Sequence, residues 1–246
     1  MAHTVRLREW LEALLTHCPS DCPLCGVRAA AGGLCIECQA ELNRTFLASG
    51  ARCERCALAL DVHGVCHDCQ ALRPDFDRVI VAFDYVFPGT LLVHQLKRQH
   101  RFVLARMLAA LLARRIRDSA MTVHSDTILL PVPASRSSLH ERGFSPPAEL
   151  AHHLSRALGL PCRTDILYRR HESGQQKRMD RHQRLVAASQ LYACAQRLDG
   201  QAVALVDDVM TTGATLHSVS RVLKQAGASS VSAFVLARTP LRARIV

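Results

Sequence analysis

The chain has 246 residues, of which 49% are hydrophobic, which is enough for one main domain and a small appended one. No apolar run approaches membrane-spanning length, and Glu9 and Glu12 interrupt the N-terminus where a signal peptide would be apolar, so we expect a cytoplasmic protein without membrane insertion. A formal charge of +10 at pH 7 favours polyanionic partners such as nucleic acid or phosphorylated small molecules.

Three segments are predicted along the chain. Apolar residues at helical spacing in Trp10–Leu15 predict a short amphipathic helix within residues 1–17. A cysteine-rich module follows over residues 18–72. The β-branched and aromatic run Val79–Tyr85 then predicts the first strand of a main domain that occupies residues 73–246.

Four CxxC pairs make up the cysteine-rich module. Nine residues separate the inner cysteines of each half, so one unit is used twice. Each CxxC turn presents two thiolates, and two turns complete a tetrahedral zinc site with no position left for water or substrate. We therefore predict two structural zinc ions with eight ligands, which are Cys22, Cys25, Cys35, Cys38, Cys53, Cys56, Cys66 and Cys69.

Disulfides are the main alternative for these cysteines, but the reducing compartment expected for this chain disfavours them. Redox CxxC motifs occur singly beside a βαβ unit, unlike the four pairs here. The spacing leaves open whether the zinc ligands pair sequentially, half by half, or interleave across the halves. His63 and His67 are expected at the surface, since the cysteines already satisfy the metals. Two four-thiolate sites would lower the formal charge from +10 to about +6.

Strands and helices alternate through the main domain. Helices are predicted over residues 90–100, 102–117, 147–158 and 216–226. Strands are predicted over residues 126–132, 165–168, 202–206 and 230–237. This alternation implies an α/β fold in which a parallel sheet carries helices on both faces.

The most specific motif is Val203–Thr215, in which an apolar strand leads into two carboxylates and a small, hydroxyl-rich loop. N–H groups at the start of the following helix favour a phosphate. Asp207 and Asp208, at the carboxyl end of the strand, are acceptors suited to the vicinal hydroxyls of a ribose. In the alternative interpretation the threonines only cap the helix, which leaves both aspartates unexplained.

This segment resembles the phosphoribosyl pyrophosphate (PRPP) motif of type I phosphoribosyltransferases. The resemblance implies that Asp207 and Asp208 contact the ribose, and that the 5′-phosphate is held by Thr211, Thr212, Gly213, Ala214 and Thr215. The loop after Leu130 occupies the place of the family's pyrophosphate-binding loop, which implies contacts from Pro133, Ala134, Ser135 and Arg136. Arg136 and Arg142 would suit phosphate as bidentate donors, with solvated loop arginines as the alternative.

Paired CxxC turns upstream of a PRPP motif are typical of the ComF/GntX family, which this chain resembles over nearly its whole length. The matching segments are Leu92–Lys97, Leu130–Arg136, Glu141–Phe144, Gln176 with Arg184, and Asp207–Thr215. The resemblance implies a double zinc ribbon before a phosphoribosyltransferase domain, and it assigns Lys97 to the ligand site. It also implies a role in natural transformation, where members are thought to assist import of single-stranded DNA beside a helicase-like partner, or a metabolic role.

Two departures from the family pattern affect the expected site. Ser145-Pro146-Pro147 replaces an Asn-Gln pair after Arg-Gly-Phe, which removes two amide side chains and stiffens the backbone. Further along, the Gln and Arg of a flexible loop are present as Gln176 and Arg184, but the expected Asn is Ala187. Any substrate contact made by these amides is absent from this chain.

Three functions remain open on the sequence. The first is a phosphoribosyltransferase that displaces pyrophosphate at ribose C1, with Mg²⁺ bound alongside PRPP. The second is an accessory that binds PRPP or a nucleotide phosphate and grips single-stranded DNA through basic residues such as Arg114, Arg115 and Arg117. The third is an adaptor whose zinc ribbons dock a helicase-like protein, which the sequence does not separate from the second.

Overall fold

The computed structural model describes residues 20–29, 33–48, 50–98, 102–170 and 191–241. The helix expected within residues 1–17 and the loop with Gln176, Arg184 and Ala187 lie outside these ranges. The described strands are β1 (Ser20–Asp21), β2 (Arg28–Ala29), β3 (Arg78–Asp84), β4 (Ile128–Pro131), β5 (Leu167–Arg169), β6 (Tyr192–Cys194), β7 (Ala202–Met210) and β8 (Ser230–Arg238). The described helices are α2 (Ile36–Leu47), α3 (His67–Leu72), α4 (Gly89–Arg98), α5 (Phe102–Arg117), α6 (Arg136–Arg142), α7 (Pro146–Leu158) and α9 (Ala214–Gln225).

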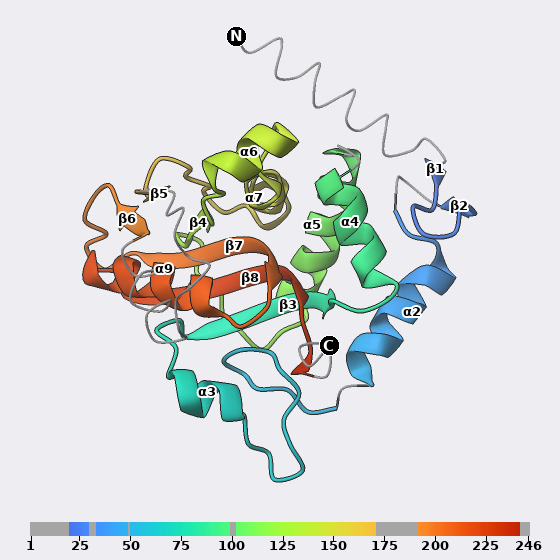
Figure 1. Ribbon diagram of the computed structural model, residues 1–246, viewed down its shortest axis with the longest axis horizontal. Coiled ribbons are helices and arrows are strands. Elements are labelled where there is room, and N and C mark those ends of the chain that lie inside the picture. Colours follow the sequence, from blue (N-terminus) through green and yellow to red (C-terminus); the bar gives the residue numbers. More distant parts are fainter. Residues whose placement is uncertain (1–19, 30–32, 49, 99–101, 171–190, 242–246) are drawn as a thin grey trace.

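Four of these strands form a parallel sheet in the order β3-β8-β7-β4. Because side chains alternate along a strand, each strand feeds two cores. On one face Ile80, Ala204 and Val206 pack among residues of α4, α5 and α7. On the other face Val81 and Leu205 pack among residues of α9. The expected parallel sheet with helices on both faces is thus confirmed, and Figure 1 shows α4, α5 and α7 apart from α9.

The segment predicted as a strand over residues 165–168 does not join this sheet. It contributes β5, which pairs antiparallel with β6 in a separate two-stranded ribbon. A second difference concerns β7. The sequence predicts a strand over residues 202–206 with the two aspartates at its carboxyl end, whereas β7 continues to Met210 and both aspartates lie within it. Pairing with β8 on one side sustains the strand through both carboxylates.

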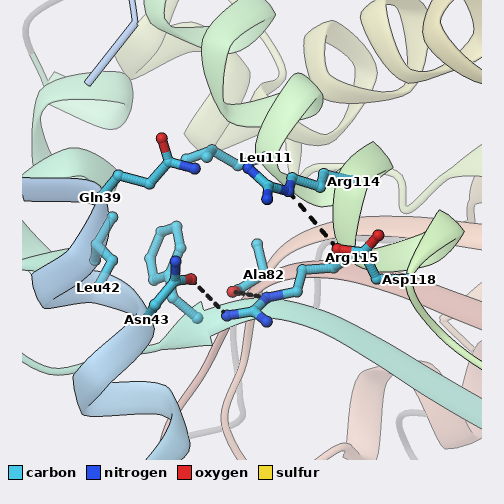
Figure 2. Close-up of a pocket in the computed structure, with 9 residues that line it drawn as sticks. Gln39, Leu42, Asn43, Ala82, Leu111, Arg114, Arg115 and Asp118 are labelled. Atoms are coloured by element: carbon cyan, nitrogen blue, oxygen red, sulfur yellow. Dashed lines mark hydrogen bonds and ion pairs between the residues drawn. The ribbon is translucent and has the colours of Figure 1, made fainter. Parts of the chain in front are cut away.

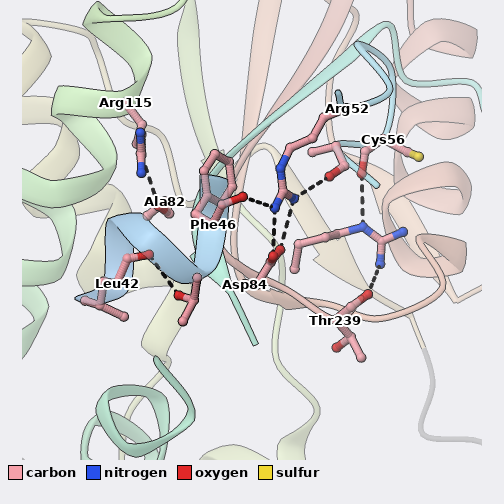
Figure 3. Close-up of polar contacts among 11 residues, drawn as sticks. Leu42, Phe46, Arg52, Cys56, Ala82, Asp84, Arg115 and Thr239 are labelled. Carbon is pink, nitrogen blue, oxygen red and sulfur yellow. Dashed lines mark hydrogen bonds and ion pairs between the residues drawn. The ribbon is translucent and has the colours of Figure 1, made fainter. Parts of the chain in front are cut away.

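The cysteine-rich module is built against the sheet. Arg52 donates two hydrogen bonds to the carboxylate of Asp84, at 3.0 and 2.7 Å, and others to the carbonyl oxygens of Phe46 and Ala57. Its guanidinium also lies 3.8 Å from the centre of the Phe46 ring. Figure 3 shows this junction at the carboxyl end of β3, where Asp84 is 3% exposed. A charge so well paired fixes the module relative to the sheet.

Both outer strands of the sheet have neighbours. Leu129 of β4 bridges to Cys162 in parallel. On the other side, α2 packs on β3, and Arg115 of α5 donates from Nε to the carbonyl oxygen of Ala82 at 3.2 Å. Between α2 and α5 lies a small cavity of about 80 Å³, shown in Figure 2. Among the described helices, none combines the length and the apolar character that a bilayer crossing would need.

Candidate functional site

The eight paired cysteines come together in two groups of four. Within each group the ligand atoms all lie within 4.8 Å of one another. Three Sγ–Sγ separations are 3.6, 3.8 and 3.4 Å, for Cys25–Cys35, Cys53–Cys69 and Cys56–Cys66. Zn–S bonds of about 2.3 Å give a tetrahedron with edges of about 3.8 Å, so both groups fit zinc. The groups follow the chain, Cys22/Cys25/Cys35/Cys38 and Cys53/Cys56/Cys66/Cys69, which selects sequential over interleaved pairing.

The repeat seen in the sequence is also a repeat in backbone geometry. The N–H of Cys22 donates to the carbonyl oxygen of Val27, and that of Cys53 to the carbonyl oxygen of Leu58, each at 2.7 Å. The fifth residue of each turn has a positive φ, +74° at Gly26 and +60° at Ala57. Only glycine adopts this region without cost, so the second turn carries a strained alanine.

The two centres differ in their surroundings. Cys25 of the first centre is exposed, whereas Cys56 of the second is 3% exposed and belongs to the core beneath α9. Burial raises the pKa of the Cys56 thiol to about 11. Burial and the neighbouring cysteines also raise the pKa of Cys69, and likewise that of Cys38 in the first centre, so this property is shared by both. Thiols of such pKa become good ligands only when a metal stabilises the thiolates, which is the role expected of zinc here.

A second site lies where β4 and β7 end. Pro131 pairs with Val206, and the N–H of Val132 donates to the carbonyl oxygen of Val206 at 2.9 Å. The loop after β4 and the carboxylates of β7 therefore meet at one edge of the sheet, the edge at which open α/β sheets bind ligands. Lys97 reaches the same place from α4, and its Nζ lies 2.8 Å from Oδ2 of Asp208.

The surroundings of Asp207 favour its protonated form. Burial, and then the negative charge of Asp208, raise the pKa of Asp207 well above its usual range. Its Oδ1 accepts the backbone N–H of Asp208 at 2.8 Å. A carboxyl group with a raised pKa can hold a proton, and it then both donates and accepts hydrogen bonds, which suits the hydroxyls of a ribose.

The loop after β7 has the features of an anion site. Gly213 caps α9 with φ +80°, and a Cβ there would come within 2.6 Å of Cε of Met210. This cap has no side chain that could accept an N–H group from the first turn of the helix. Thr211, Thr212 and Thr215 are exposed, and Thr212 Oγ1 accepts the N–H of Ala214 at 3.3 Å. Thr212 therefore helps to cap the start of α9.

The loop after β4 is shorter than expected. Pro133 and Ala134 are half-buried, and Ser135 caps α6 by accepting the N–H of Ser138 at 3.1 Å. Arg136 is therefore the exposed first residue of α6, while Arg142 is in its last turn, about 9 Å further along the helix axis. The two arginines do not share one position at the loop.

The Ser-Pro-Pro departure has a structural role of its own. Ser145 accepts the N–H of Ala148 at 3.4 Å, and the two prolines occupy the first positions of α7. Serine at the cap and proline at the first turn are the residues preferred at a helix start. The segment therefore starts a helix where the family pattern has two amides.

Arg238 was missed by sequence reasoning. It ends β8, is 1% exposed, and donates to carbonyl oxygens of three segments. From Nη1 it reaches Met210 and Thr239 at 3.0 and 3.2 Å and also Thr211, and from Nε it reaches Cys56 at 3.0 Å. The available signal was an arginine directly after the apolar run 231–237, since a buried arginine must be hydrogen-bonded.

Comparisons with known proteins agree with this geometry. A double zinc ribbon domain matches residues 13–70, and a phosphoribosyl transferase domain matches residues 142–244. Competence protein F of Haemophilus influenzae is 31% identical over 215 residues, which cover 85% of this chain and 92% of the relative. DNA utilization protein YhgH of Escherichia coli O157:H7 is 28% identical, covering 90% and 98%. Competence protein ComFC of Bacillus subtilis is 26% identical, covering 84% of each.

The fold and the two kinds of site define a class of protein in which a double zinc ribbon is joined to a phosphoribosyltransferase domain. Within that class, identity and coverage together place this chain in the competence protein F family, also called ComF/GntX.

Proposed function

We propose that this chain is a ComF-like protein of natural competence that binds PRPP or a phosphoribosyl nucleotide at the carboxyl edge of its sheet. One observation carries the proposal. Asp207 and Asp208, the phosphate loop 211–215 and the ammonium group of Lys97 converge where β4 and β7 end. Buried acceptors for a ribose beside helix N–H groups for a phosphate are complementary to a sugar phosphate.

Each group has a separate task in this site. The loop N–H groups and threonine hydroxyls bind the 5′-phosphate. The two carboxylates bind the ribose hydroxyls, and their oxygens suit Mg²⁺, which neutralises diphosphate charge when bound with PRPP. Lys97, already paired with Asp208, supplies a cation on the diphosphate side. Together these residues position the ligand and balance its charge, which is what PRPP chemistry requires of a protein.

The DNA role rests on charge and on relatives named for competence and DNA utilization. A formal charge of +10 favours single-stranded DNA as a partner of the basic surface. Not every basic residue serves this purpose, because Arg115 is turned inward. It donates to Asn43 Oδ1 at 2.8 Å and to the Ala82 carbonyl, and it lies over the Phe46 ring. Figure 2 shows it between α2 and β3. Exposed Arg114 and Arg117 are the better candidates for DNA contact.

The alternative is an active phosphoribosyltransferase in nucleotide or other metabolism. It is supported by the same carboxylates and by Lys97, because a site that held only a phosphate would not need paired acidic residues. A competence helicase-like protein stays a proposed partner of the zinc ribbons, since their closed four-cysteine centres leave no chemistry for the metals except structural support.

Calorimetric titration of zinc-loaded protein with PRPP and Mg²⁺ tests the proposal. We expect saturable binding that is lost in the Asp207→Asn/Asp208→Asn double variant. Single-stranded DNA binding of the same variant, measured by fluorescence anisotropy, should be unchanged if the basic surface is separate. Absence of PRPP binding in folded wild-type protein would contradict the proposed sugar-phosphate site. Binding followed by release of pyrophosphate with a nucleobase would favour the transferase.

A further inference from the structure

We propose that the second zinc centre sets the geometry of the phosphate loop, and that Arg238 is the positioning residue that connects them. The inference rests on the proposed function for its ligand, but the contacts that carry it belong to the protein alone. Arg238 donates from Nε to the carbonyl of Cys56, a ligand of that centre, and from Nη1 to carbonyls of Met210 and Thr211. One buried guanidinium is therefore hydrogen-bonded both to the metal-binding turn and to the loop.

The bonds to Met210 and Thr211 orient the N–H groups of the loop. In a trans peptide the C=O and the following N–H point in opposite directions. The peptide bonds after Met210 and Thr211 are trans. Since both carbonyls are directed to Arg238, the N–H groups of Thr211 and Thr212 are directed away from it, toward the side where the phosphate is proposed to bind. Fixing two peptide planes in advance lowers the ordering cost of binding.

The hydrogen bond from Arg238 to Cys56 connects the phosphate loop to the turn that binds zinc. The carbonyl of Cys56 belongs to the turn that zinc closes by holding Cys53 and Cys56 together. Figure 3 shows Cys56 and Thr239 hydrogen-bonded to the same guanidinium, near the Arg52–Asp84 junction. Without the metal, the turn loses its constraint and the Nε of a buried guanidinium loses a fixed acceptor, which is costly to leave unsatisfied.

Apolar packing supplies a second connection between the same two places. Phe76, 1% exposed, is in the same core cluster as Cys56, Leu58 and Met210. A Cβ at Gly213 would lie 3.7 Å from Cζ of Phe76, so this ring lies directly beneath the loop. The first centre contacts a different part of the molecule, since the carbonyl of Pro23 accepts a hydrogen bond from Gln95 of α4 at 2.8 Å. We therefore expect the second centre, and not the first, to be coupled to the loop 211–215.

The experiment compares Cys69→Ser, which disrupts the second centre, with Cys38→Ser, its counterpart in the first. Amide exchange followed by mass spectrometry reports on residues 211–215, and calorimetry reports PRPP affinity. We expect Cys69→Ser to speed exchange of the loop and to weaken PRPP binding about tenfold, the loss corresponding to one charged hydrogen bond. In Cys38→Ser the loop should exchange as in wild type. Wild-type exchange of the loop in folded Cys69→Ser would overturn the inference.

Arg238→Lys tests the connection in protein that keeps both metals, with Arg221→Lys as a matched arginine on α9. A lysine keeps the charge but cannot reach three segments at once. We expect faster loop exchange in Arg238→Lys at two zinc ions per chain, and no change in Arg221→Lys. Unchanged exchange in Arg238→Lys would contradict the proposed role, even if Cys69→Ser fails to fold.

Zinc binding at the second centre and PRPP binding must affect each other equally. Zinc release can therefore be measured as a test that a purely structural role of Arg238 would not alter. If zinc in the second centre strengthens PRPP binding, PRPP must strengthen zinc retention there. In Cys38→Ser protein, saturating PRPP should slow zinc transfer to a chromophoric chelator, and adding Arg238→Lys should remove this effect. Equal transfer rates with and without bound PRPP would refute the coupling. A wild type that binds no PRPP would instead refute the proposed function, and the exchange measurements would still decide this inference.

Discussion

The ammonium group of Lys97 lies 2.8 Å from a carboxylate oxygen of Asp208, and this pair joins the end of α4 to the end of β7. The contact matters because Asp208 follows another buried carboxylate. Lys97 is therefore the cation that offsets an accumulation of negative charge before any ligand arrives.

We expect Lys97→Met to lower the free energy of unfolding by about 1–2 kcal/mol, between the values for exposed and fully buried pairs. It should also weaken PRPP binding, because a cation on the diphosphate side is lost. Urea denaturation and calorimetry measure the two effects. Lys224→Met is the control, since Lys224 pairs with Asp77 at 2.6 Å in the last turn of α9, at the opposite end of that helix from the loop. If Lys97→Met and Lys224→Met changed PRPP affinity equally, Lys97 would have no specific role in binding PRPP.

Asp207 predicts a pH dependence of stability. Its pKa in the folded protein is raised, chiefly by burial, above the value of about 3.9 in an unfolded chain. The folded state thus holds a proton more tightly, and stability of the free protein falls as pH rises from near 4 toward the folded pKa. Asp207→Asn cannot ionise, so it should unfold a few degrees higher than wild type at pH 7 and show no such gain below pH 4.

Differential scanning calorimetry at three pH values measures this effect. Asp165→Asn provides a control of opposite sign, because the hydrogen bonds from Arg163 lower the pKa of Asp165 to about 2. Loss of this carboxylate should reduce stability at neutral pH, and the effect should shrink as pH falls from near 4 through about 2. A gain from Asp207→Asn that does not vary with pH would show that ionisation is not its cause.

The two zinc centres should release metal at different rates. Cys25 is exposed and, among the described residues, the first centre packs in a cluster of three buried residues, whereas Cys56 is in the larger core beneath α9. Chelator should therefore remove zinc in two phases, with the first centre faster and without global unfolding. Absorbance of a chromophoric chelator, followed beside near-ultraviolet circular dichroism, measures both. Cys38→Ser should keep only the slow phase, and a remaining fast phase would mean that the order is reversed.

The junction of Arg52 with Asp84 should dominate the attachment of the module. Asp84→Asn leaves a nearly buried guanidinium without its charge partner, and we expect a loss of about 3 kcal/mol in unfolding free energy. Arg78→Ala is the matched control, because Arg78 also joins the sheet to the module, through Glu54, but in an exposed pair at 3.1 Å. That substitution should cost less than about 1 kcal/mol in the same urea titration. Similar losses of unfolding free energy in the two variants would show that burial does not make the Arg52–Asp84 pair the stronger one.

Regular patterns in the sequence predicted the sheet and its main helices. The β-branched run around Val81 became β3, and the amphipathic pattern of α5 predicted Phe102–Arg117, the range that the helix has. Cysteine spacing predicted two metal sites because ligand geometry depends on local turns. Helix α2 was missed because the zinc ligands, and not apolar periodicity, mark where it begins.

What could not be predicted depends on contacts between distant segments. Arg238 donates to carbonyl groups of residues that lie 182 and 28 positions earlier in the chain. Every residue has a backbone carbonyl, so the sequence does not indicate which carbonyl groups accept these hydrogen bonds. The pairing of β5 with β6 likewise depends on residues far beyond the predicted strand. Arg115 read as a surface cation because its inward partners, Asn43 and Ala82, come from other elements.

β3 is an edge strand of the sheet, and this position affects how a fragment without the cysteine-rich module would behave. An uncovered strand offers its N–H and C=O groups to any other chain, and short open sheets associate through such edges. Here α2 and the guanidinium of Arg115 occupy that border. Of these two, only α2 belongs to the cysteine-rich module, so we expect a fragment that begins after the module to associate through β3 more readily than the whole chain does.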